Sequence, residues 1–466
     1  MLNSLLKKYP TITNDTIISI LPDNDISISQ ISKNTHLKLM PDAWIVLRMC
    51  NGLKSTSQIY EQLKEKYSIE KQELINFLID AEKKSNIVFQ RKSKYHKINI
   101  KGDGRTFFPS VATILLTNKC NLKCEYCYGN YSSLNNEFLP VTKVPLLFDI
   151  LERNGVIGIE LSGGEPLLHP NFNHILRLAC KKKWHINILS NGVLFNEDIY
   201  KTISENRERI YLQISIDGST ESINEKVRKV KNSFNRTLNA IKHLIKMNVK
   251  VKVVLVLTPR NRKDLTNSCE LMKNIGVTNF SISLADSIGR GAFIKNSDGT
   301  FFNNIYNEDF KALTKEIEKI KKDYREIIFG VENLKRDFIG DIENLGNCGA
   351  GWRIVTILPN GDVKGCQLLP VEIVKLGNIF NDDFVSMFNG REINHFYQSF
   401  WKTEKEKLCE GCEYINYCAK CSTKVFLANK NRLNEGKDYC PFAKKMNMRE
   451  IMNFHHNFEY NIYRKN

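Results

Sequence analysis

The 466-residue sequence lacks any apolar run long enough to span a bilayer. Its longer apolar runs, such as VKVVLVL (251–257), fall far below the ~20 residues that a membrane-spanning helix needs. The N-terminal segment MLNSLLKKYPTITND also lacks the long apolar core and the small-residue cleavage site of a secretory signal peptide. These absences exclude a membrane-embedded protein and lead us to expect a cytoplasmic protein without a membrane partner.

A recognisable nucleic-acid-binding module is also missing, although the formal net charge is +17. The basic residues are spread along the chain rather than massed in one stripe, so no nucleic-acid partner is expected. Residues 1–105 carry 17 Lys and Arg against 11 Asp and Glu, which gives +6. Such a surface either keeps the protein soluble or attracts an acidic partner such as an acidic peptide.

Cysteine, in contrast, is abundant: the chain has 13, and ten of them fall in clusters with short spacings. Disulfides are rare in a reducing compartment, so clustered cysteines in a cytoplasmic protein indicate metal ligation. Cys50, Cys180 and Cys269 stand alone among apolar neighbours, and each is expected to behave as a small buried hydrophobic residue.

The first hundred residues have the pattern of a small α+β unit. Amphipathic helices are predicted at 55–67 and 73–81, and Ser55 with Gln58 can form a capping box at the start of the first. Two short strands flank these helices, and a basic segment that we interpret as a linker follows. The strands and the linker are 16–21, 85–90 and 91–105.

Between about 110 and 290, apolar strand segments alternate with longer helical segments. Six repeats of this kind predict a parallel sheet with helices outside it, either barrel-like or doubly wound. In either architecture the chemistry is expected at the carboxyl ends of the strands. The strand segments are 111–117, 156–162, 185–190, 210–216, 250–257 and 279–285.

Three cysteines, Cys120, Cys124 and Cys127, follow the first of these strands directly. Their C-x3-C-x2-C spacing differs from the paired C-x2-C of a zinc ribbon. Three thiolates can ligate three irons of a 4Fe–4S cluster and leave the fourth iron open to an exogenous ligand. We interpret the open position as the place of substrate chemistry; the alternative is a zinc knuckle joined to an unrelated α/β domain.

These residues and the motifs that follow resemble the radical S-adenosylmethionine (radical SAM) superfamily. The resemblance begins with the three cysteines and the aromatic Tyr126 before the third, and it continues at later strand ends as far as SIGRGA (287–292). One departure is Lys229, where the family usually has a glycine. The matching residues are Gly163, Gly164, Glu165 and Pro166 in LSGGEPLL, Ser190 and Asn191 in LSNG, Ser215 and Asp217 in SIDG, and Arg228 in EKVRKV.

The resemblance implies a role for each motif. The open iron takes the amino and carboxylate groups of S-adenosylmethionine, and Glu165 can pair with the ammonium. Ser215 and Asp217 would face the ribose, while Arg228 aligns with the arginine that pairs with the methionine carboxylate. One electron breaks the sulfur–carbon bond, and the 5′-deoxyadenosyl radical then abstracts hydrogen from the substrate.

The region of about 340–445 holds seven more cysteines, and their order resembles the SPASM domain. That domain carries two auxiliary 4Fe–4S clusters in enzymes that modify peptides, whereas zinc sites built from seven cysteines would lack one ligand. By this resemblance the outer cluster would be held by Cys409, Cys412, Cys418 and Cys440, and the inner cluster by Cys348, Cys366 and Cys421.

Two departures from the SPASM pattern concern the inner cluster. Two residues rather than the usual three separate Cys418 from Cys421, and the segment GAGWRI lacks the extra cysteine often found after the first. The inner cluster therefore has either an open iron that could bind a substrate thiolate, or a non-cysteine ligand or water at that position.

Residues 1–100 resemble the RiPP recognition element, a winged-helix-like module that binds the leaders of ribosomally synthesised and post-translationally modified peptides (RiPPs), and the best match is 39–89. Such a module can add the leader as an extra strand at a sheet edge. Its charge of +6 over 1–105 would suit an acidic leader. The alternative is a domain that only packs against the barrel.

Together the resemblances imply an α/β protein: a partial (β/α)6 TIM-like barrel with an N-terminal winged-helix-like domain and a C-terminal cysteine-rich iron–sulfur domain. A C-terminal helix and tail would follow, with solvated His455 and His456. The expected domains are 1–100 for leader binding, 101–340 for the radical SAM core, 341–445 for the SPASM domain and 446–466 for the tail.

The implied activity is that of an oxidoreductase with three 4Fe–4S clusters and S-adenosylmethionine. It would form a thioether between a cysteine sulfur and a carbon in a precursor peptide, as in sactipeptides, with a flavodoxin or ferredoxin as electron donor. A peptide epimerase or a carbon–carbon cross-linking enzyme would share every motif. A sulfatase-maturing enzyme fits the sequence less well, because Gln367 replaces the aspartate expected beside the middle SPASM cysteine. A non-catalytic iron–sulfur protein would not cleave S-adenosylmethionine.

Overall fold

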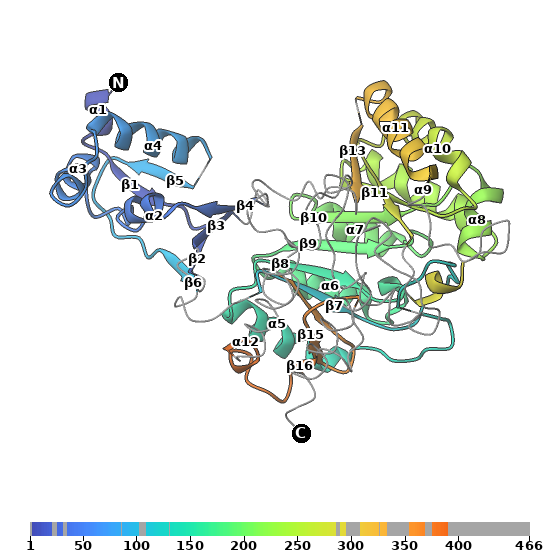
Figure 1. Ribbon diagram of the computed structural model, residues 1–466. Coiled ribbons are helices and arrows are strands. Elements are labelled where there is room, and N and C mark those ends of the chain that lie inside the picture. Colours follow the sequence, from blue (N-terminus) through green and yellow to red (C-terminus); the bar gives the residue numbers. More distant parts are fainter. Residues whose placement is uncertain are drawn as a thin grey trace, which may run out of the picture. The chain divides into compact units, whose positions relative to one another are not determined.

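The structure is a computed structural model, which divides into one compact unit within Met1–Phe108 and a second that begins at Pro109 (Figure 1). None of the described helices is both long and apolar enough to cross a membrane. The described residues are 2–20, 26–30, 35–84, 86–101, 109–129, 131–285, 289–294, 308–325, 327–332, 354–368 and 375–389.

The first unit combines helices with two small sheets. One sheet is the antiparallel pair of β1 and β5, and the other has the strand order β4–β3–β2–β6. The elements are α1 (Leu2–Leu5), β1 (Tyr9–Ile12), β2 (Thr16–Ile20), β3 (Ile26–Gln30), β4 (Thr35–Leu39), α2 (Pro41–Leu47), α3 (Thr56–Lys64), α4 (Lys71–Lys83), β5 (Ile87–Gln90) and β6 (Asn99–Lys101).

Both helices predicted in this unit are present, and so is the capping box. The backbone N–H of Gln58 donates to Ser55 Oγ at 3.3 Å, and the N–H of Ser55 donates to Gln58 Oε1 at 2.8 Å. Helix α4 buries Leu74 and Leu78 in a core with strand residues such as Ile18. These local patterns could be predicted because cap and apolar face are both encoded within a few residues.

The interpretation of 91–105 as a linker was wrong in part. Strand β6 lies within it and pairs in parallel with β2, with Ile100 opposite Ile18. A strand of three residues has too short a pattern to be recognised, and its Ile100 side chain is 44% exposed. At the other end of this sheet, β4 is the edge strand among the strands that the structure describes.

The second unit alternates strands and helices. The helices and strands as far as β13 are β7 (Val111–Leu115), η2 (Val141–Lys143), α5 (Val144–Arg153), β8 (Gly158–Ser162), η3 (Pro166–Leu168), α6 (Phe172–Cys180), β9 (His185–Ser190), α7 (Glu197–Glu205), β10 (Ile210–Ser215), α8 (Glu221–Arg228), α9 (Ser233–Lys246), β11 (Lys250–Leu257), η4 (Arg262–Asp264), α10 (Leu265–Asn274), β12 (Asn279–Leu284), η5 (Gly289–Phe293), α11 (Glu308–Asp323) and β13 (Ile328–Glu332).

Strand order decides between the two architectures that the sequence left open. Strands β7 to β13 lie side by side in chain order, and each pairs in parallel with the next (Figure 1). In a doubly wound sheet the order of the strands reverses at a switch point, and helices cover both faces. A sequential strand order with right-handed crossovers instead keeps the helices on one face. The fold is therefore barrel-like, and β13 adds one parallel strand to the six that were predicted.

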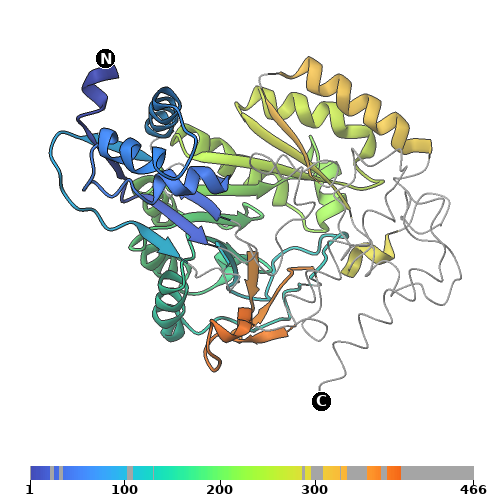
Figure 2. The same cartoon turned by 60° about the vertical axis from the view of Figure 1, so that its left-hand side comes forward.

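A hairpin from the third region extends the same sheet (Figure 2). Strand β14 (Ile354–Ile357) pairs in parallel with β7, and β15 (Asp362–Lys364) and β16 (Lys375–Asn378) continue it before α12 (Ser386–Asn389). The predicted turn at PNGD is present, and Gly361 has φ +89° there. A Cβ at that position would lie 2.3 Å from the Phe380 ring.

The isolated cysteines are largely as predicted. Cys50 and Cys269 are fully buried, and Cys180 is half-buried. Burial raises the pKa of the Cys50 and Cys269 thiols to about 12, so both behave as neutral apolar side chains. The expected C-terminal helix, with His455 and His456, lies outside the described residues.

Candidate functional site

The predicted cysteines lie in one loop between β7 and α5, at the carboxyl edge of the sheet. Cys120, Cys124 and Cys127 are half-exposed free thiols. The N–H of Cys120 donates to the Ser132 carbonyl at 3.0 Å, and that of Cys127 to the Cys124 carbonyl at 3.3 Å. Burial raises the pKa of the Cys120 and Cys124 thiols to about 12, so both thiols are neutral near pH 7, and a cation bound beside them would favour their thiolate forms.

Arg290, in η5 after strand β12, donates hydrogen bonds to this loop. Its backbone N–H donates to the Cys127 carbonyl and its Nε to the Cys124 carbonyl, both at 2.9 Å. One terminal nitrogen donates to the Tyr131 carbonyl at 2.8 Å. The motif SIGRGA was noted in the sequence without a role for its arginine, which positions the backbone of two predicted cluster ligands.

The two glycines of the GGEP motif allow close contact with the cysteine loop. Gly163 has φ +138°, and a Cβ there would lie 2.3 Å from the Thr117 carbonyl oxygen. A Cβ at Gly164 would lie 2.3 Å from the Lys119 carbonyl oxygen. The N–H of Gly164 donates to Thr117 at 2.8 Å, and that of Glu165 to Lys119 at 2.9 Å. Only glycine, which has no Cβ, allows the GGEP segment to pack this closely against the backbone of Thr117 and Lys119.

Glu165 lies buried directly after these glycines, with 1% of its surface exposed. Its carboxylate accepts hydrogen bonds from Ser190 Oγ at 2.8 Å, the Asn191 N–H at 2.8 Å and the Leu167 N–H at 3.2 Å. Burial nevertheless raises the pKa of this carboxyl to about 7. The site thus holds an acid that ionises more readily when a cation is bound beside it.

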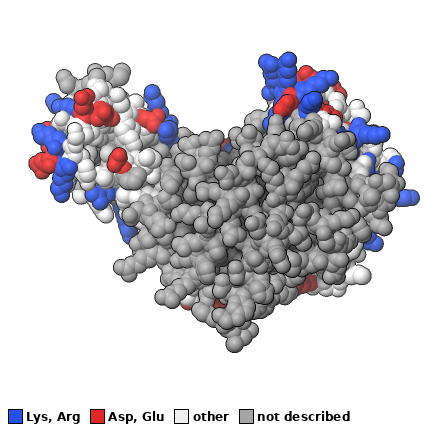
Figure 3. Space-filling view, in the orientation of Figure 1, with Lys and Arg blue, Asp and Glu red and all other residues white. Residues whose placement is uncertain are grey.

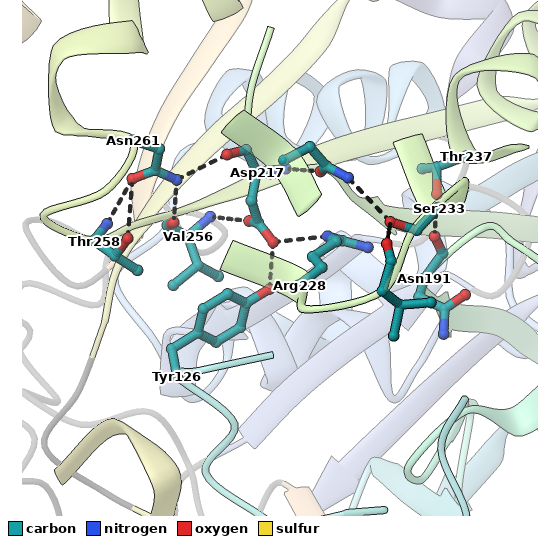
Figure 4. A network of polar contacts seen from close by, with 11 residues as sticks. Tyr126, Asn191, Asp217, Arg228, Ser233, Thr237, Val256, Thr258 and Asn261 are labelled. Carbon is teal, nitrogen blue, oxygen red and sulfur yellow. Dashed lines mark hydrogen bonds and ion pairs between the residues drawn. The ribbon is translucent and has the colours of Figure 1, made fainter. Parts of the chain in front are cut away.

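Asp217 lies at the centre of a second buried network (Figure 4). Its Oδ2 accepts hydrogen bonds from Tyr126 Oη at 2.7 Å and from Arg228 Nε at 2.8 Å. Its Oδ1 accepts from the Val256 N–H at 2.9 Å. The side chains of Arg228 and Asp217 are 1% and 0% exposed, so this is a fully buried ion pair. The network joins the cysteine loop to the ends of three different elements.

Arg228 has two terminal nitrogens that remain free. Both are buried, and neither has a hydrogen-bond partner among the residues that the structure describes. Burial alone would lower the pKa of this guanidinium, but the Asp217 carboxylate raises it, so the group is a cation. An unsatisfied buried donor costs about 1–3 kcal/mol. An anionic group such as a carboxylate would satisfy both donors.

Lys229 occupies the position where a glycine was expected. Its φ is +60°, so it ends α8 in the left-handed conformation that glycine adopts without strain. Its Nζ lies 3.6 Å from Glu125 Oε2, which Arg260 Nε also contacts at 2.5 Å. The departure therefore keeps the backbone turn and adds an ion pair to the cysteine loop.

The third-region hairpin contacts the same loop. Gln367 Nε2 donates to the hydroxyl of the half-buried Tyr128, which follows Cys127. Cys366 precedes Gln367 and is half-exposed. The other cysteines predicted for the auxiliary clusters lie outside the described residues: Cys348, Cys409, Cys412, Cys418, Cys421 and Cys440.

The structure thus brings most of the predicted site to one edge of the sheet. Ser215 is the last residue of β10, Pro166 begins η3, and the Asn191 amide donates to Asn121 Oδ1 in the cysteine loop at 2.8 Å. No three His, Cys, Asp or Glu side chains among the described residues converge on a single metal ion. In a cluster each thiolate binds a different iron. Three thiols and a buried guanidinium with free donors fit an iron–sulfur cluster and a carboxylate-bearing ligand.

A partial parallel barrel with C-x3-C-x2-C after its first strand defines a radical SAM domain. The family model of the Radical SAM superfamily matches residues 114–272. The model of an iron–sulfur cluster-binding domain, SPASM, matches residues 348–422. The chain therefore contains a radical SAM domain followed by a SPASM domain.

Two curated proteins of Bacillus subtilis (strain 168) are similar in sequence. The antilisterial bacteriocin subtilosin biosynthesis protein AlbA is 28% identical over 447 residues, which cover 93% of this chain and 94% of that protein. The sporulation killing factor maturation protein SkfB is 27% identical over 300 residues, which cover 62% of this chain and 67% of that protein. Both alignments extend well beyond the cysteine motif.

Among solved structures, Streptococcus suis SuiB bound to the precursor peptide SuiA has a similar fold. The TM-score is 0.64 at 16% sequence identity, and the match covers 93% of this chain and 98% of that chain. At this level of identity the likeness concerns the fold.

Proposed function

We propose that this protein is a radical SAM peptide maturase that forms an intramolecular thioether in a ribosomally synthesised precursor peptide. The bond would join a cysteine sulfur to a carbon of another residue. The observation that carries the proposal is the similarity to a bacteriocin biosynthesis protein over 93% of the chain. A match of that extent includes most of the first unit and the cysteine-rich third region as well as the barrel.

The site residues support this proposal by their chemistry. Cys120, Cys124 and Cys127 would hold the radical SAM cluster. The free nitrogens of Arg228 would donate to the carboxylate of S-adenosylmethionine. The buried Glu165 carboxylate would pair with the ammonium of the same ligand, because a bound cation offsets the cost of burying its charge. When bound, the cluster and S-adenosylmethionine supply a carbon radical that abstracts hydrogen from the substrate.

Asp217 and Tyr126 have a positioning role in this proposal. Asp217 fixes Arg228 through Nε and leaves its terminal nitrogens free for a ligand. Tyr126 donates to the same carboxylate and so connects the cysteine loop to the arginine. Ser190 and Asn191 orient the Glu165 carboxylate in the same way. Each predicted ligand contact is thereby supported by a neighbour that restricts its side-chain freedom.

The third region would provide the two auxiliary clusters. We assign Cys409, Cys412, Cys418 and Cys440 to the outer one and Cys348, Cys366 and Cys421 to the inner one. Among the described residues, Cys366 supports the assignment because its neighbour Gln367 contacts Tyr128 in the radical SAM loop. An inner cluster with three cysteines would leave one iron for a substrate thiolate, which favours thioether formation over the other reactions.

The first unit would bind the leader of the precursor peptide. Its edge strand β4 offers a backbone against which an extended peptide can pair. Lysines and arginines outnumber acidic residues in 1–105, but Figure 3 shows both kinds mixed on the face that it presents. The structure of SuiB bound to its precursor peptide SuiA supports a peptide partner for this fold.

Co-expression with the product of an adjacent small open reading frame tests the proposal. A thioether removes two hydrogens per link and protects the linked cysteine from alkylation by iodoacetamide, which mass spectrometry detects. Loss of two hydrogens from a peptide whose cysteine is still alkylated would indicate a carbon–carbon bond. An unchanged mass with altered stereochemistry would indicate an epimerase. The Cys124→Ala variant, co-expressed in parallel, should leave the peptide unmodified.

A further inference from the structure

The outer side of the cysteine loop carries a cluster of cations that the proposed chemistry does not use. We call it the basic rim. Its members come from the cysteine loop, from α8 with the residues that follow it, and from the segment after β11, and all are exposed. They are Lys123, Lys226, Lys229, Lys231, Arg260 and Lys263.

Backbone hydrogen bonds and ion pairs bring these three segments together. The N–H of Lys123 donates to the Arg228 carbonyl at 3.2 Å, and the N–H of Glu125 to the Val227 carbonyl at 3.1 Å. The cysteine loop therefore runs along the last turn of α8. Lys229 and Arg260 both reach Glu125 with their side chains. These contacts join Lys123, Lys229 and Arg260. The other three members are close to them in the sequence: Lys226 and Lys231 flank Lys229, and Lys263 follows Arg260 by three positions.

The rim is strongly positive. Glu125 is the acidic residue in contact with it, and that side chain is only 10% exposed. Lys123, Lys226, Lys231 and Lys263 form no ion pair within the described part of the chain. The nearest exposed acid on α8 is Glu221, at the opposite end of the helix. A second acid, Glu225, is half-buried on the same turn of α8, and its Oε1 accepts a hydrogen bond from the Ser233 N–H at 3.0 Å. Six exposed cations against two partly covered carboxylates attract an anionic partner.

We propose that the basic rim is the docking surface of an acidic electron-carrier protein, a flavodoxin or a ferredoxin. This inference rests on the proposed function, since a cluster on this loop must receive one electron from outside. The carrier loses one electron and the cluster gains it, with no change in covalent bonds. Lys123 lies between Cys120 and Cys124 in the sequence, so a partner bound to the rim lies against the backbone that holds the cluster.

A charge reversal that avoids the site tests the inference. Lys226→Glu, Lys231→Glu and Lys263→Glu together change six units of charge without altering a predicted ligand or the Glu125 ion pairs. The matched control reverses three exposed lysines that precede β9 and β11, at the amino edge of the same sheet: Lys181→Glu, Lys183→Glu and Lys246→Glu. The two triple variants have the same net charge.

The assay compares two reductants in 5′-deoxyadenosine formation by the reconstituted holoenzyme. With a bacterial flavodoxin and its reductase at low salt, the rim variant should be slower by about tenfold or more, while the control variant stays near wild type. With dithionite, which needs no docking, all three proteins should have equal rates. High salt should reduce the advantage of the wild type over the rim variant.

Calorimetric titration of flavodoxin into each protein separates this inference from the proposed function. If no protein cleaves S-adenosylmethionine with dithionite, the proposed function fails, and weaker flavodoxin binding by the rim variant alone still supports docking. Equal binding by the rim and control variants overturns the docking proposal. So does a rim variant that binds flavodoxin normally but loses binding to an acidic leader peptide or to RNA, because the rim then serves another partner.

Discussion

The substitution Glu165→Gln tests the electrostatic state of the buried carboxyl at the site. Burial raises its pKa from the ordinary 4.5 of a glutamate side chain to about 7, although three donors of the chain contact it. The folded protein therefore holds the proton to higher pH than the unfolded chain does. For a raised pKa, the contribution to stability is complete below pH 4.5 and is lost as the pH rises through 7.

The size of this effect follows from the interval between the two pKa values. An increase from 4.5 to about 7 corresponds to about 3 kcal/mol, at about 1.4 kcal/mol for each tenfold change in proton affinity. Glutamine does not titrate. The free energy of unfolding of Glu165→Gln minus that of the wild type should therefore rise by up to about 3 kcal/mol from pH 5 to pH 8. The amide also alters hydrogen bonds to Ser190 and Asn191, but that change is independent of pH and cancels in the slope.

Urea unfolding of the ligand-free, metal-free full-length chain at several pH values, followed by circular dichroism, measures the slope. Ser190→Ala provides an internal check, because it removes one donor to the carboxylate and should move the loss of stability to higher pH. A difference between wild type and Glu165→Gln that stays flat from pH 5 to pH 8 would refute the reasoning.

Three other substitutions have defined outcomes in thermal or urea unfolding. Gly164→Ala should cost about 1–3 kcal/mol because its methyl would lie 2.3 Å from a backbone oxygen, whereas Gly158→Ala, with its nearest neighbour at 3.6 Å, should cost less; equal losses would contradict this. Arg228→Met should cost about 3–5 kcal/mol because it leaves Asp217 buried without its cation, and an unchanged midpoint would count against the pair. Lys229→Gly should stay within about 1 kcal/mol of wild type, because relief of the left-handed strain offsets the lost exposed ion pair; a loss above about 2 kcal/mol would show that the Glu125 contact dominates.

Much of the barrel could be predicted because its elements are encoded locally. Strands β9 and β11 have the predicted bounds, and β10 ends one residue earlier. Whether the sheet was barrel-like or doubly wound could not be predicted, because that choice depends on strand pairing between segments far apart in the chain. Strand β14 was missed for the same reason: its partner β7 lies over 240 residues away in the sequence.

The positions of the site motifs were predicted, but their supporting contacts were not. Sequence patterns placed Asp217 and Arg228 at the site separately, whereas their buried ion pair with a Tyr126 contact depends on tertiary packing. The sequence placed Gly163 and Gly164 in the GGEP motif, but only the structure shows that they admit the backbone of Thr117 and Lys119. The motifs identify the site residues, whereas the contacts that position these residues depend on the fold.

The most direct test of the proposed function is the release of 5′-deoxyadenosine. Anaerobically reconstituted wild-type protein, reduced with dithionite in the presence of S-adenosylmethionine, should form this nucleoside, and a Cys124→Ala variant reconstituted in parallel should not. An iron-loaded wild-type protein that leaves S-adenosylmethionine intact, or a Cys124→Ala variant that cleaves it equally well, would contradict the assignment of Cys120, Cys124 and Cys127 as the site of radical formation.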